Sequence, residues 1–352
     1  MVETASIEHR IRNAWLGRIS GCMLGKPVEI LSMREGHAAL ADYLQRAGVD
    51  ELRDYVPLVA DTMVADLYPE TCLGRLNVAI PDDDINYTVL ALMIVERHGL
   101  DFSTADVARM WLNVLPGGMT FTAERDAYVR LLADAGMAFA MGAEPRFDLD
   151  ECSDNPFNDW IGAQIRADLY GWVVPGRPDV AAELAARDAA LSHRGEGVHG
   201  ARFVAAAGAC LVAGADIGTA IGEALALLPV ESDCAAAVAL GRSVAAAGDG
   251  PESIHSAYEG MSPVHTVNNL ALVAWGLTRG ADDFSVAIGD TVAAGWDTDC
   301  NGATVGALWG LTGRPVPDHW AAPWAGRVQT TLAGVGELSV DDLVARTLSV
   351  VG

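Results

Sequence analysis

Two groups of aspartates stand out because each immediately precedes a sequence that favours a helix. The three aspartates at 82–84 follow a proline, and those at 297 and 299 precede a run of small apolar residues. The N-terminus of a helix tolerates negative charge, and aspartate is a good capping residue. Each group therefore has a simple structural interpretation, in which one aspartate caps and the others are solvated. The alternative is a site that binds a cation.

The second group favours the cation site. Asp297 and Asp299 lie beside Trp296 and enter a helix that looks buried, where two carboxylates without a counter-charge would be costly. The nearest basic residues along the chain are Arg279 and Arg314. Carboxylate oxygens suit Mg²⁺, Mn²⁺ or Ca²⁺ better than zinc. If the two groups meet, they would hold a pair of ions about 3.5–4 Å apart.

The segments that would position these residues have helical periodicity. Val107, Met110, Trp111, Val114 and Leu115 recur at the spacing of one apolar stripe of an amphipathic helix. Similar patterns predict helices over 85–97, 125–140, 179–191, 200–213, 217–228, 234–247, 266–278, 283–294 and 298–311. Long alternation of β-branched and polar residues is not found, so a substantial sheet is not expected. The predicted fold class is all-α.

Small residues bear on how these helices pack. Gly17, Gly21 and Gly25 repeat every four residues along one helical face, which lets helix backbones approach closely. Turn-forming sequences occur at 115–118, 153–156, 175–178 and 312–315. None of these turns is long enough to divide the chain. We therefore expect one compact, orthogonally packed multi-helix domain over residues 1–352.

Composition limits the possible partners. Lys and Arg total 23 against 47 Asp and Glu, which gives a net charge of −24. A surface that negative repels phosphate backbones and anionic lipid, which argues against nucleic-acid and membrane-surface partners. Divalent cations are attracted. An anionic substrate would have to be met by a metal or by local helix N-termini.

Cysteine usage and hydropathy favour a cytoplasmic protein. The six cysteines are scattered, with no CxxC pair, as is typical of free thiols in a reducing compartment. The first fifteen residues carry several charges and no signal-peptide core. The longest apolar stretch, 203–228, is interrupted by Asp216 and Glu223, so we expect two buried helices and no membrane span.

Three segments resemble the ADP-ribosylglycohydrolases. Residues 17–29, GRISGCMLGKPVE, resemble the Gly-rich N-terminal helix of that family, which ends in a glutamate. The aspartates at 82–84 resemble its central Asp-Asp motif, and residues 295–299 resemble its C-terminal Asp-x-Asp motif. The order and spacing fit, and the resemblance covers the chain roughly from Ile11 to Trp309.

The resemblance implies an all-α fold with two Mg²⁺ ions in a cleft, with Mn²⁺ as an alternative. The residues carried over as metal ligands are Asp83, Asp84, Asp297 and Asp299, with Asp82 as a further candidate where the family usually has threonine. The resemblance also implies that Glu29 is the active-site glutamate.

Four further residues are candidates for substrate binding. His193 and the serine before it resemble a Ser-His pair that lines the family's ribose pocket, although a loop histidine satisfied by backbone groups fits equally well. Asn155 opens a segment that resembles a broad bacterial branch of the family. Trp296 could form a wall of the site or pack in the core, and Asn269 is a weaker polar candidate.

Some positions depart from the family pattern. Cys22 stands where the family often has aspartate, and Cys300 where it often has a metal-binding threonine. A thiol is a poor ligand for Mg²⁺, so water would complete the coordination. The Gly/Ser-rich phosphate loop has no clean match, and the nearest segment is 116–120.

The first functional hypothesis is a Mg²⁺-dependent hydrolase that cleaves an N-ribosyl bond, ADP-ribosyl or phosphoribosyl, in a small-molecule intermediate. Glu29 would act as general base or position the water while the aspartates hold metal. An ADP-ribosylated protein is the alternative substrate. A second hypothesis is a catalytically silent module that binds ADP-ribose or a nucleotide. A calcium-stabilised structural protein is a third, but it does not explain acidic groups at buried-looking helix starts.

Overall fold

The computed structural model describes residues 6–352, and helices make up most of the chain. The α-helices are α1 Ile7–Gly25, α2 Glu29–Glu35, α3 His37–Arg46, α4 Met63–Leu67, α5 Asp83–His98, α6 Thr104–Val114, α7 Thr122–Ala135, α8 Leu149–Ser153, α9 Asp168–Trp172, α10 Pro178–Ala189, α11 Gly195–Val212, α12 Ile217–Ala226, α13 Asp233–Ala247, α14 Glu252–Ala257, α15 Thr266–Arg279, α16 Phe284–Ala293, α17 Thr298–Gly310, α18 Asp318–Ala321 and α19 Val340–Ser349. The predicted all-α class is confirmed.

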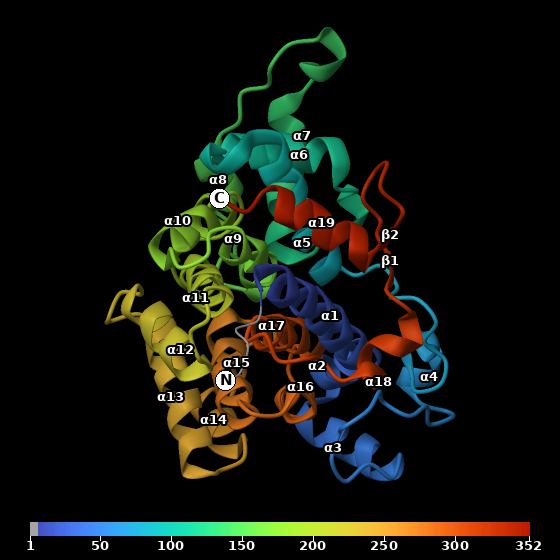
Figure 1. The fold of residues 1–352 in the computed structure, drawn as a ribbon. Coiled ribbons are helices and arrows are strands. Elements are labelled where there is room, and N and C mark those ends of the chain that lie inside the picture. Colours follow the sequence, from blue (N-terminus) through green and yellow to red (C-terminus); the bar gives the residue numbers. More distant parts are fainter. Residues whose placement is uncertain (1–5) are drawn as a thin grey trace.

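Short 3₁₀ turns and one small hairpin complete the fold. The 3₁₀ turns are η1 Lys26–Val28, η2 Pro69–Thr71, η3 Gly99–Asp101, η4 Gly117–Met119, η5 Phe139–Met141, η6 Ile161–Arg166 and η7 Ala322–Trp324. Strands β1 Arg327–Gln329 and β2 Glu337–Ser339 pair antiparallel, with Val328 opposite Leu338. The hairpin lies beside α19, away from the centre of the molecule (Figure 1).

The helices predicted from apolar periodicity are present, with ends that differ by a few residues in most cases. The prediction over 125–140 is wrong at its C-terminal end, because α7 stops at Ala135. Gly136 has a φ of +48°, a positive value that glycine adopts more readily than other residues. The chain then forms an extension through η5 to α8, which projects from the body of the molecule (Figure 1).

Helices α1 and α17 pack antiparallel through glycine. A Cβ atom built on Gly17, Gly21 or Gly25 would lie 2.1, 2.0 and 2.3 Å, respectively, from backbone atoms of α17. The Thr298 hydroxyl also donates a hydrogen bond to the Gly25 carbonyl, at 2.8 Å. The predicted close approach is therefore confirmed. It places the C-terminal end of α1 against the N-terminal end of α17 at the centre of the molecule (Figure 1).

Arg18 joins α1 to the start of α5. Its guanidinium is fully buried and donates to the Asp84 backbone carbonyl from Nε (3.1 Å) and Nη2 (2.8 Å). Nη2 also lies 3.2 Å from Asp84 Oδ1, and Nη1 lies 2.8 Å from Asp168 Oδ2 on α9. A buried arginine needs such carboxylate partners. The same helix α1 therefore holds the N-termini of both α5 and α17.

The two ends of the described chain pack on each other. The Trp15 indole N–H of α1 donates to the Thr347 hydroxyl of α19 at 3.1 Å. Arg12 of α1 forms a 2.6 Å ion pair with Asp341 at the start of α19. Contacts between residues so far apart in the sequence are consistent with a single domain over residues 1–352. This domain assignment stays a prediction.

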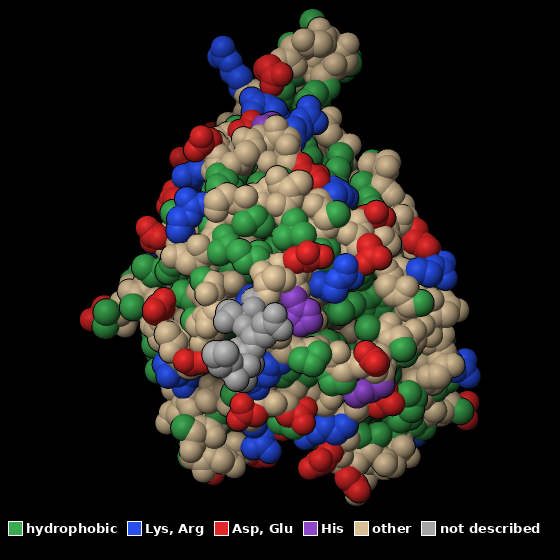
Figure 2. Space-filling view, in the orientation of Figure 1, with side chains coloured by type: hydrophobic (Ala, Val, Ile, Leu, Met, Phe, Trp, Pro, Cys, Tyr) green, Lys and Arg blue, Asp and Glu red, His purple; other side chains and the backbone are tan. Residues whose placement is uncertain are grey.

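The surface carries charges of both signs, and the apolar stretch of the sequence lies in two helices. Acidic and basic side chains are interspersed over the face shown in Figure 2. Within residues 6–352, no helix is both long and apolar enough to cross a membrane. The apolar stretch at 203–228 forms the separate helices α11 and α12, as predicted. All six cysteines are buried and free.

Candidate functional site

Lys26 joins the two aspartate groups. Its ammonium lies 2.7 Å from Asp82 Oδ2, 3.2 Å from Asp299 Oδ2 and 2.8 Å from Glu29 Oε2. The Asp82 contact is an ion pair whose geometry falls outside that of a hydrogen bond. These carboxylates come from the start of α5, the first turn of α17 and the start of α2.

The inference that the aspartates lack basic neighbours is therefore wrong. It considered only residues near Asp297 along the chain, whereas the counter-charges arrive through space. Lys26 contacts one carboxylate of each aspartate group, and Arg18 contacts Asp84. Helix α1 and the turn that follows it carry both cations. The negative charge of the site is thus partly compensated before any metal binds.

Each aspartate of the first group has a separate environment. Asp82 is the N-cap of α5, and its Oδ1 accepts a hydrogen bond from the Asp84 N–H at 2.9 Å. Asp84 is fully buried, and its Oδ2 has no hydrogen-bond partner among the described residues. Asp83 is partly exposed and lines a cavity. One aspartate does cap the helix, but the other two are not simply solvated.

The second group is also buried. Asp297 and Asp299 are 4% and 1% exposed. Asp299 Oδ1 accepts from the Cys300 N–H at 3.1 Å. Asp297 Oδ1 has no hydrogen-bond partner in the described part of the chain. Buried carboxylate oxygens are almost always paired, so this oxygen and Asp84 Oδ2 mark a place for an additional positive group.

The donor atoms of the site fit a divalent cation. Ligand atoms of Asp84, Asp299 and Cys300 lie within 4.8 Å of one another, as do those of Glu29, Asp297 and Asp299. Asp84 and Asp297, which carry the unpartnered oxygens, belong to these two sets, one to each. Carboxylates are the ligands that Mg²⁺ and Mn²⁺ prefer. A third set, in which Cys22 joins Asp82 and Asp84, includes a thiol, which suits these ions poorly.

Burial and mutual repulsion control the protonation of the site. Burial, reinforced by neighbouring carboxylates, raises the pKa of Asp84, Asp297 and Glu29 well above their ordinary values. Burial alone would lower the pKa of Lys26. Asp82, Asp299 and Glu29 outweigh that effect and raise the pKa of Lys26 well above its usual range. Lys26 is therefore charged, and the carboxylates around it favour a further cation.

A cavity of about 440 Å³ opens beside these groups. The polar side chains that line it are Lys26, Glu29, Asp83, Thr122, Glu124, Ser262, Asp297 and Cys300. Aromatic and aliphatic side chains line the rest, among them Tyr68, Phe121, Trp160, Ile165 and Val264. The volume is in the range of small-molecule sites, in which a few polar groups stand among apolar ones. Thr122, with a φ of +42°, also lines this cavity.

Glu124 is a lining residue that the sequence analysis did not identify. Its carboxylate is 3% exposed and accepts a hydrogen bond from Arg166 Nη1 at 2.6 Å. Arg166 is held in turn by the carboxylate of Asp188 and by the Ser192 hydroxyl, the latter at 2.9 Å. Burial raises the pKa of Glu124. A glutamate in the first turn of a helix is too common in sequences to be singled out.

The four predicted substrate-binding residues all lie outside the lining of this cavity. His193 is 1% exposed; its Nδ1 lies 2.8 Å from the Ser192 hydroxyl and its Nε2 lies 3.8 Å from Glu124. Asn155 donates to the Ser192 carbonyl at 2.9 Å and accepts from the Phe157 N–H at 3.0 Å. Both support the cavity wall from behind, and their binding roles stay predictions. The later part of the Asn155 segment, at Trp160, does line the cavity.

Asn269 holds the start of α17. It is fully buried, and its Oδ1 accepts hydrogen bonds from the Asp297 N–H at 3.3 Å and from Asn301 Nδ2 at 2.7 Å. Its Nδ2 donates to the carbonyls of Pro263 and His265 at 2.7 and 2.8 Å. The side chain therefore positions Asp297 relative to the loop before α15.

Trp296 packs behind the second aspartate group. Its ring lies 4.4 Å from that of His255 and 6.5 Å from that of Tyr258, between ring centres. Trp296 is 9% exposed and has a φ of +59°, a conformation uncommon for a residue other than glycine. Its position supports the turn that presents Asp297. A direct role in substrate binding stays a prediction.

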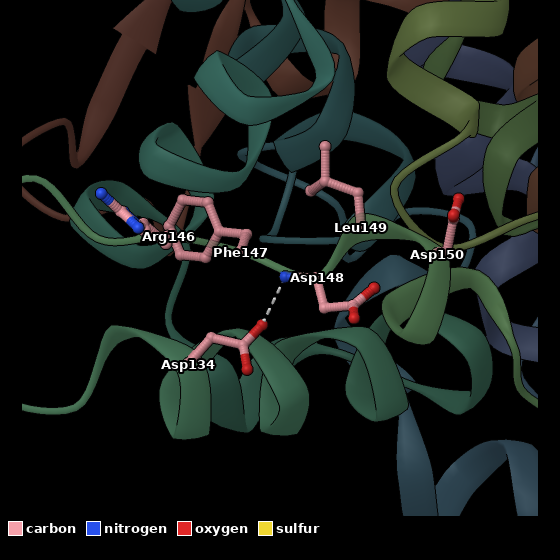
Figure 3. Close-up of a pocket in the computed structure, with 6 residues that line it drawn as sticks. All are labelled: Asp134, Arg146, Phe147, Asp148, Leu149 and Asp150. Atoms are coloured by element: carbon pink, nitrogen blue, oxygen red, sulfur yellow. Dashed lines mark hydrogen bonds between the residues drawn. The ribbon is translucent and has the colours of Figure 1, made fainter.

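Another cavity lies at the base of the extension. It has a volume of about 580 Å³ and is lined by residues 134 and 146–150 (Figure 3). The Asp148 N–H donates to Asp134 Oδ2 at 2.8 Å, which ties the returning chain to α7. The lining does not include residues of either aspartate group. Glu29, Asp83 and Asp297 line the smaller cavity instead.

An all-α fold that brings carboxylates from three helix starts together beside one cavity defines a class of helical proteins with a buried acidic site. A family model described as ADP-ribosylglycohydrolase matches residues 3–348, so the chain belongs to the ADP-ribosylglycohydrolase family. That family comprises hydrolases of glycosidic bonds, acts on ADP-ribosyl substrates and generally binds divalent metals.

The fold has a counterpart among solved structures. A structure titled "ADP-ribosylglycohydrolase-related protein complex" matches with a TM-score of 0.64 and 20% identity, and the match covers 98% of each chain. At that identity the likeness shows a shared fold. The comparison with curated proteins gave no match.

Proposed function

We propose that this chain hydrolyses an N-ribosyl bond of a small molecule with the aid of a divalent cation, Mg²⁺ or Mn²⁺. Two groups of ligand atoms could hold such an ion, one that includes Asp84 and Asp299 and one that includes Asp297 and Asp299. The observation that supports this most is the pair of buried, unpartnered carboxylate oxygens, Asp84 Oδ2 and Asp297 Oδ1, next to the cavity that Glu29 lines.

A bound divalent ion would supply a positive charge that fixes ribose hydroxyls and lowers the pKa of a water molecule. Glu29 faces the same cavity, and its raised pKa makes it a better proton acceptor. As the C1–N bond breaks, its electron pair leaves with nitrogen and the water oxygen bonds to C1. Glu29 takes the proton of that water. Lys26, 2.8 Å from Glu29, holds the carboxylate in position.

The charges of the lining indicate which part of a substrate fits. Among the described lining residues, Lys26 is the one cation, against Glu29, Asp83, Glu124 and Asp297. All its ion pairs are with carboxylates of the protein, so it is not free to bind a diphosphate. Apolar and aromatic side chains suit a planar, uncharged group. The lining therefore favours a ribosyl compound without a diphosphate in the cavity over an ADP-ribosyl one.

The test is release of free ribose product from three classes of probe: unphosphorylated N-ribosides, phosphoribosyl compounds and ADP-ribosyl-arginine. We expect turnover with Mg²⁺ or Mn²⁺, none with chelator, and the fastest turnover on a probe without diphosphate. Glu29→Gln should lower kcat by about 100-fold or more while metal binding is retained. Glu35→Gln, exposed at the end of the same helix α2, is the matched control and should turn over normally.

The alternatives give different results. Turnover only on an ADP-ribosylated protein would favour de-ADP-ribosylation of side chains. Binding without turnover on every probe, for wild type and Glu29→Gln alike, would favour a silent module for ADP-ribose or nucleotide. Turnover that survives complete metal removal would contradict the proposed chemistry.

A further inference from the structure

The carboxylate of Glu124 presents one of its oxygens to the cavity. The residue lines the cavity and is 3% exposed. Its Oε1 accepts a hydrogen bond from Arg166 Nη1 at 2.6 Å, and this guanidinium favours the ionised form of the carboxylate. Its Oε2 accepts none from any other residue in the described part of the chain. Because an ionised carboxylate has room for several donors, Oε2 is the atom that a molecule bound in the cavity would meet.

The charges behind Glu124 do not cancel. Arg166 forms ion pairs with both Glu124 and Asp188, so one positive charge serves two carboxylates. The second oxygen of Asp188 accepts a hydrogen bond from the Tyr170 hydroxyl at 2.6 Å. Burial, and then Arg166, lower the pKa of His193 well below its usual value, so His193 contributes no positive charge. The negative charge left over in this cluster is therefore available at Glu124 Oε2, beside the cavity.

Gly162 leaves the space that this carboxylate occupies. A Cβ atom built on Gly162 would lie 2.1 Å from Glu124 Oε1 and 2.6 Å from Oε2. Arg166 Nη1 also donates to the Gly162 carbonyl at 3.2 Å, so one guanidinium holds both the carboxylate and the turn η6. The carboxylate is therefore fixed between α7 and η6, as a binding group must be to discriminate between ligands.

The side chains next to Glu124 suit a planar group. Phe121 precedes α7 and Trp160 precedes η6, so two aromatic rings belong to the same wall of the cavity as Glu124. Aromatic rings stack favourably on planar heterocycles. Glu29 and Asp297, in contrast, come from the starts of α2 and α17, where the proposed ion would hold the ribose. This division of the lining leaves the Glu124 wall for the aglycone.

We propose that Glu124 determines which aglycone this site accepts: a planar heterocycle whose N–H group donates a hydrogen bond to Glu124 Oε2. An aglycone without that donor would leave a buried, charged acceptor unpaired, which is a strong source of discrimination. The proposal rests on the proposed hydrolysis of N-ribosyl bonds and names the class of ribosyl compound that is hydrolysed. Glu124 acts as a specificity residue, and the chemical step stays with the groups around Glu29.

Two matched pairs of nucleosides test this selection. Adenosine differs from purine riboside only in an amino group on the six-membered ring, and guanosine differs from inosine only in an amino group at another carbon of that ring. For each probe, kcat/KM is measured by release of free ribose and Kd by isothermal titration calorimetry, both with Mg²⁺. We expect wild type to prefer the amino member of at least one pair by about 30-fold.

Glu124→Gln should remove this preference. Its amide oxygen should face Arg166, which can only donate, so that its NH₂ group faces the cavity. The amino probes should then lose their advantage, while the unsubstituted probes keep most of their kcat/KM. Gly162→Ala keeps the charge but displaces the carboxylate, and should weaken the preference as well. Glu183→Gln, on α10 with a side chain 61% exposed, is the matched control and should leave the preference unchanged.

The outcomes separate this proposal from the proposed hydrolase. Equal values for both members of both pairs in wild type, or failure of every probe to bind, would overturn the selection by Glu124. An unchanged preference in folded Glu124→Gln, or an equal loss on both members of a pair, would also overturn it, the latter because Glu124 would then only support Arg166. Selective binding of amino probes without any turnover would instead remove the proposed hydrolase and leave the selection intact. If Glu124→Gln does not fold, as judged by circular dichroism, an unchanged preference in Gly162→Ala decides against the selection.

Discussion

His255 lies behind the second aspartate group, between two rings. It stacks on His37 with 3.9 Å between ring centres and meets the edge of Trp296 at 4.4 Å. Its Nε2 lies 2.9 Å from the Ala294 carbonyl. Burial, and then the neighbouring His37, lower the pKa of His255 from 6.5 to about 4. The folded protein therefore holds this histidine neutral at pH values where an unfolded chain would charge it.

This shift predicts a pH-dependent stability. Between pH 6.5 and 4 the unfolded chain binds more protons at this residue than the folded one, so stability falls as the pH falls. Because the ring is only partly buried, we expect His255→Phe to reduce the loss of stability between pH 7.5 and 5 by about 1 kcal/mol. Urea unfolding at the two pH values measures this. The same exchange at exposed His319 is the control, and identical pH responses of His255→Phe and wild type would contradict the assignment.

Single residues show where sequence reasoning succeeds and where it stops. The five aspartates were found because carboxylates at helix starts form a local pattern, and Glu29 was found through the family resemblance. The structure brings Glu29, Asp82 and Asp299 together around Lys26. The role of Lys26 itself was missed. Its two aspartate partners lie 56 and 273 residues away, and no local pattern encodes an ion pair of that separation. Asn269 was selected for its polarity, but its bonds to Asp297 became evident only in three dimensions.

At the scale of elements, the site depends on how closely α1 approaches α17. The glycines of α1 face Gly302, Gly306 and Thr298 with no room for a side chain. This contact fixes Lys26 at one helix end relative to Asp299 at the other. A change of a few tenths of an ångström in the separation of the helices would alter the distance between Lys26 and Asp299.

Gly21→Ala tests this contact. The new Cβ would lie 2.0 Å from the Gly302 carbonyl oxygen, so the backbones must separate. We expect a loss of about 3 kcal/mol in the free energy of unfolding, despite the better helix propensity of alanine. Gly222→Ala in α12 is the matched control, because its Cβ would meet no atom within 4 Å. That variant should gain about 0.5–1 kcal/mol in urea unfolding; equal effects of the two changes would refute the packing argument.

Elements with a clear apolar stripe could be predicted from the sequence, and the others could not. Helix α6 has such a stripe and also a Ser103–Asp106 capping box. The short helices α4, α8 and α18 are too brief to display a period, and tertiary contacts determine them. The end of α7 was misplaced because apolar residues continue past Gly136 into η5. There the backbone conformation of one glycine outweighs the hydrophobic pattern.

At the scale of the whole molecule, the site is assembled from distant parts of the chain. Its carboxylates come from residues 29, 82–84 and 297–299, and its other wall comes from 121–124 and 160–165. No fragment of the chain holds all of these, so the proposed cation site requires the completed fold. The net charge of −24 adds a long-range attraction for divalent ions.

The most direct test of the central claim is Mn²⁺ binding to chelator-treated protein, measured by equilibrium dialysis. Asp297→Asn keeps the volume of the side chain but removes the charge of the unpartnered oxygen. Asp282→Asn is the matched control, since that side chain is 98% exposed. We predict that wild type and Asp282→Asn bind Mn²⁺ alike, and that Asp297→Asn binds it at least about tenfold more weakly. Wild-type affinity in folded Asp297→Asn would contradict the claim that the two aspartate groups form a metal site.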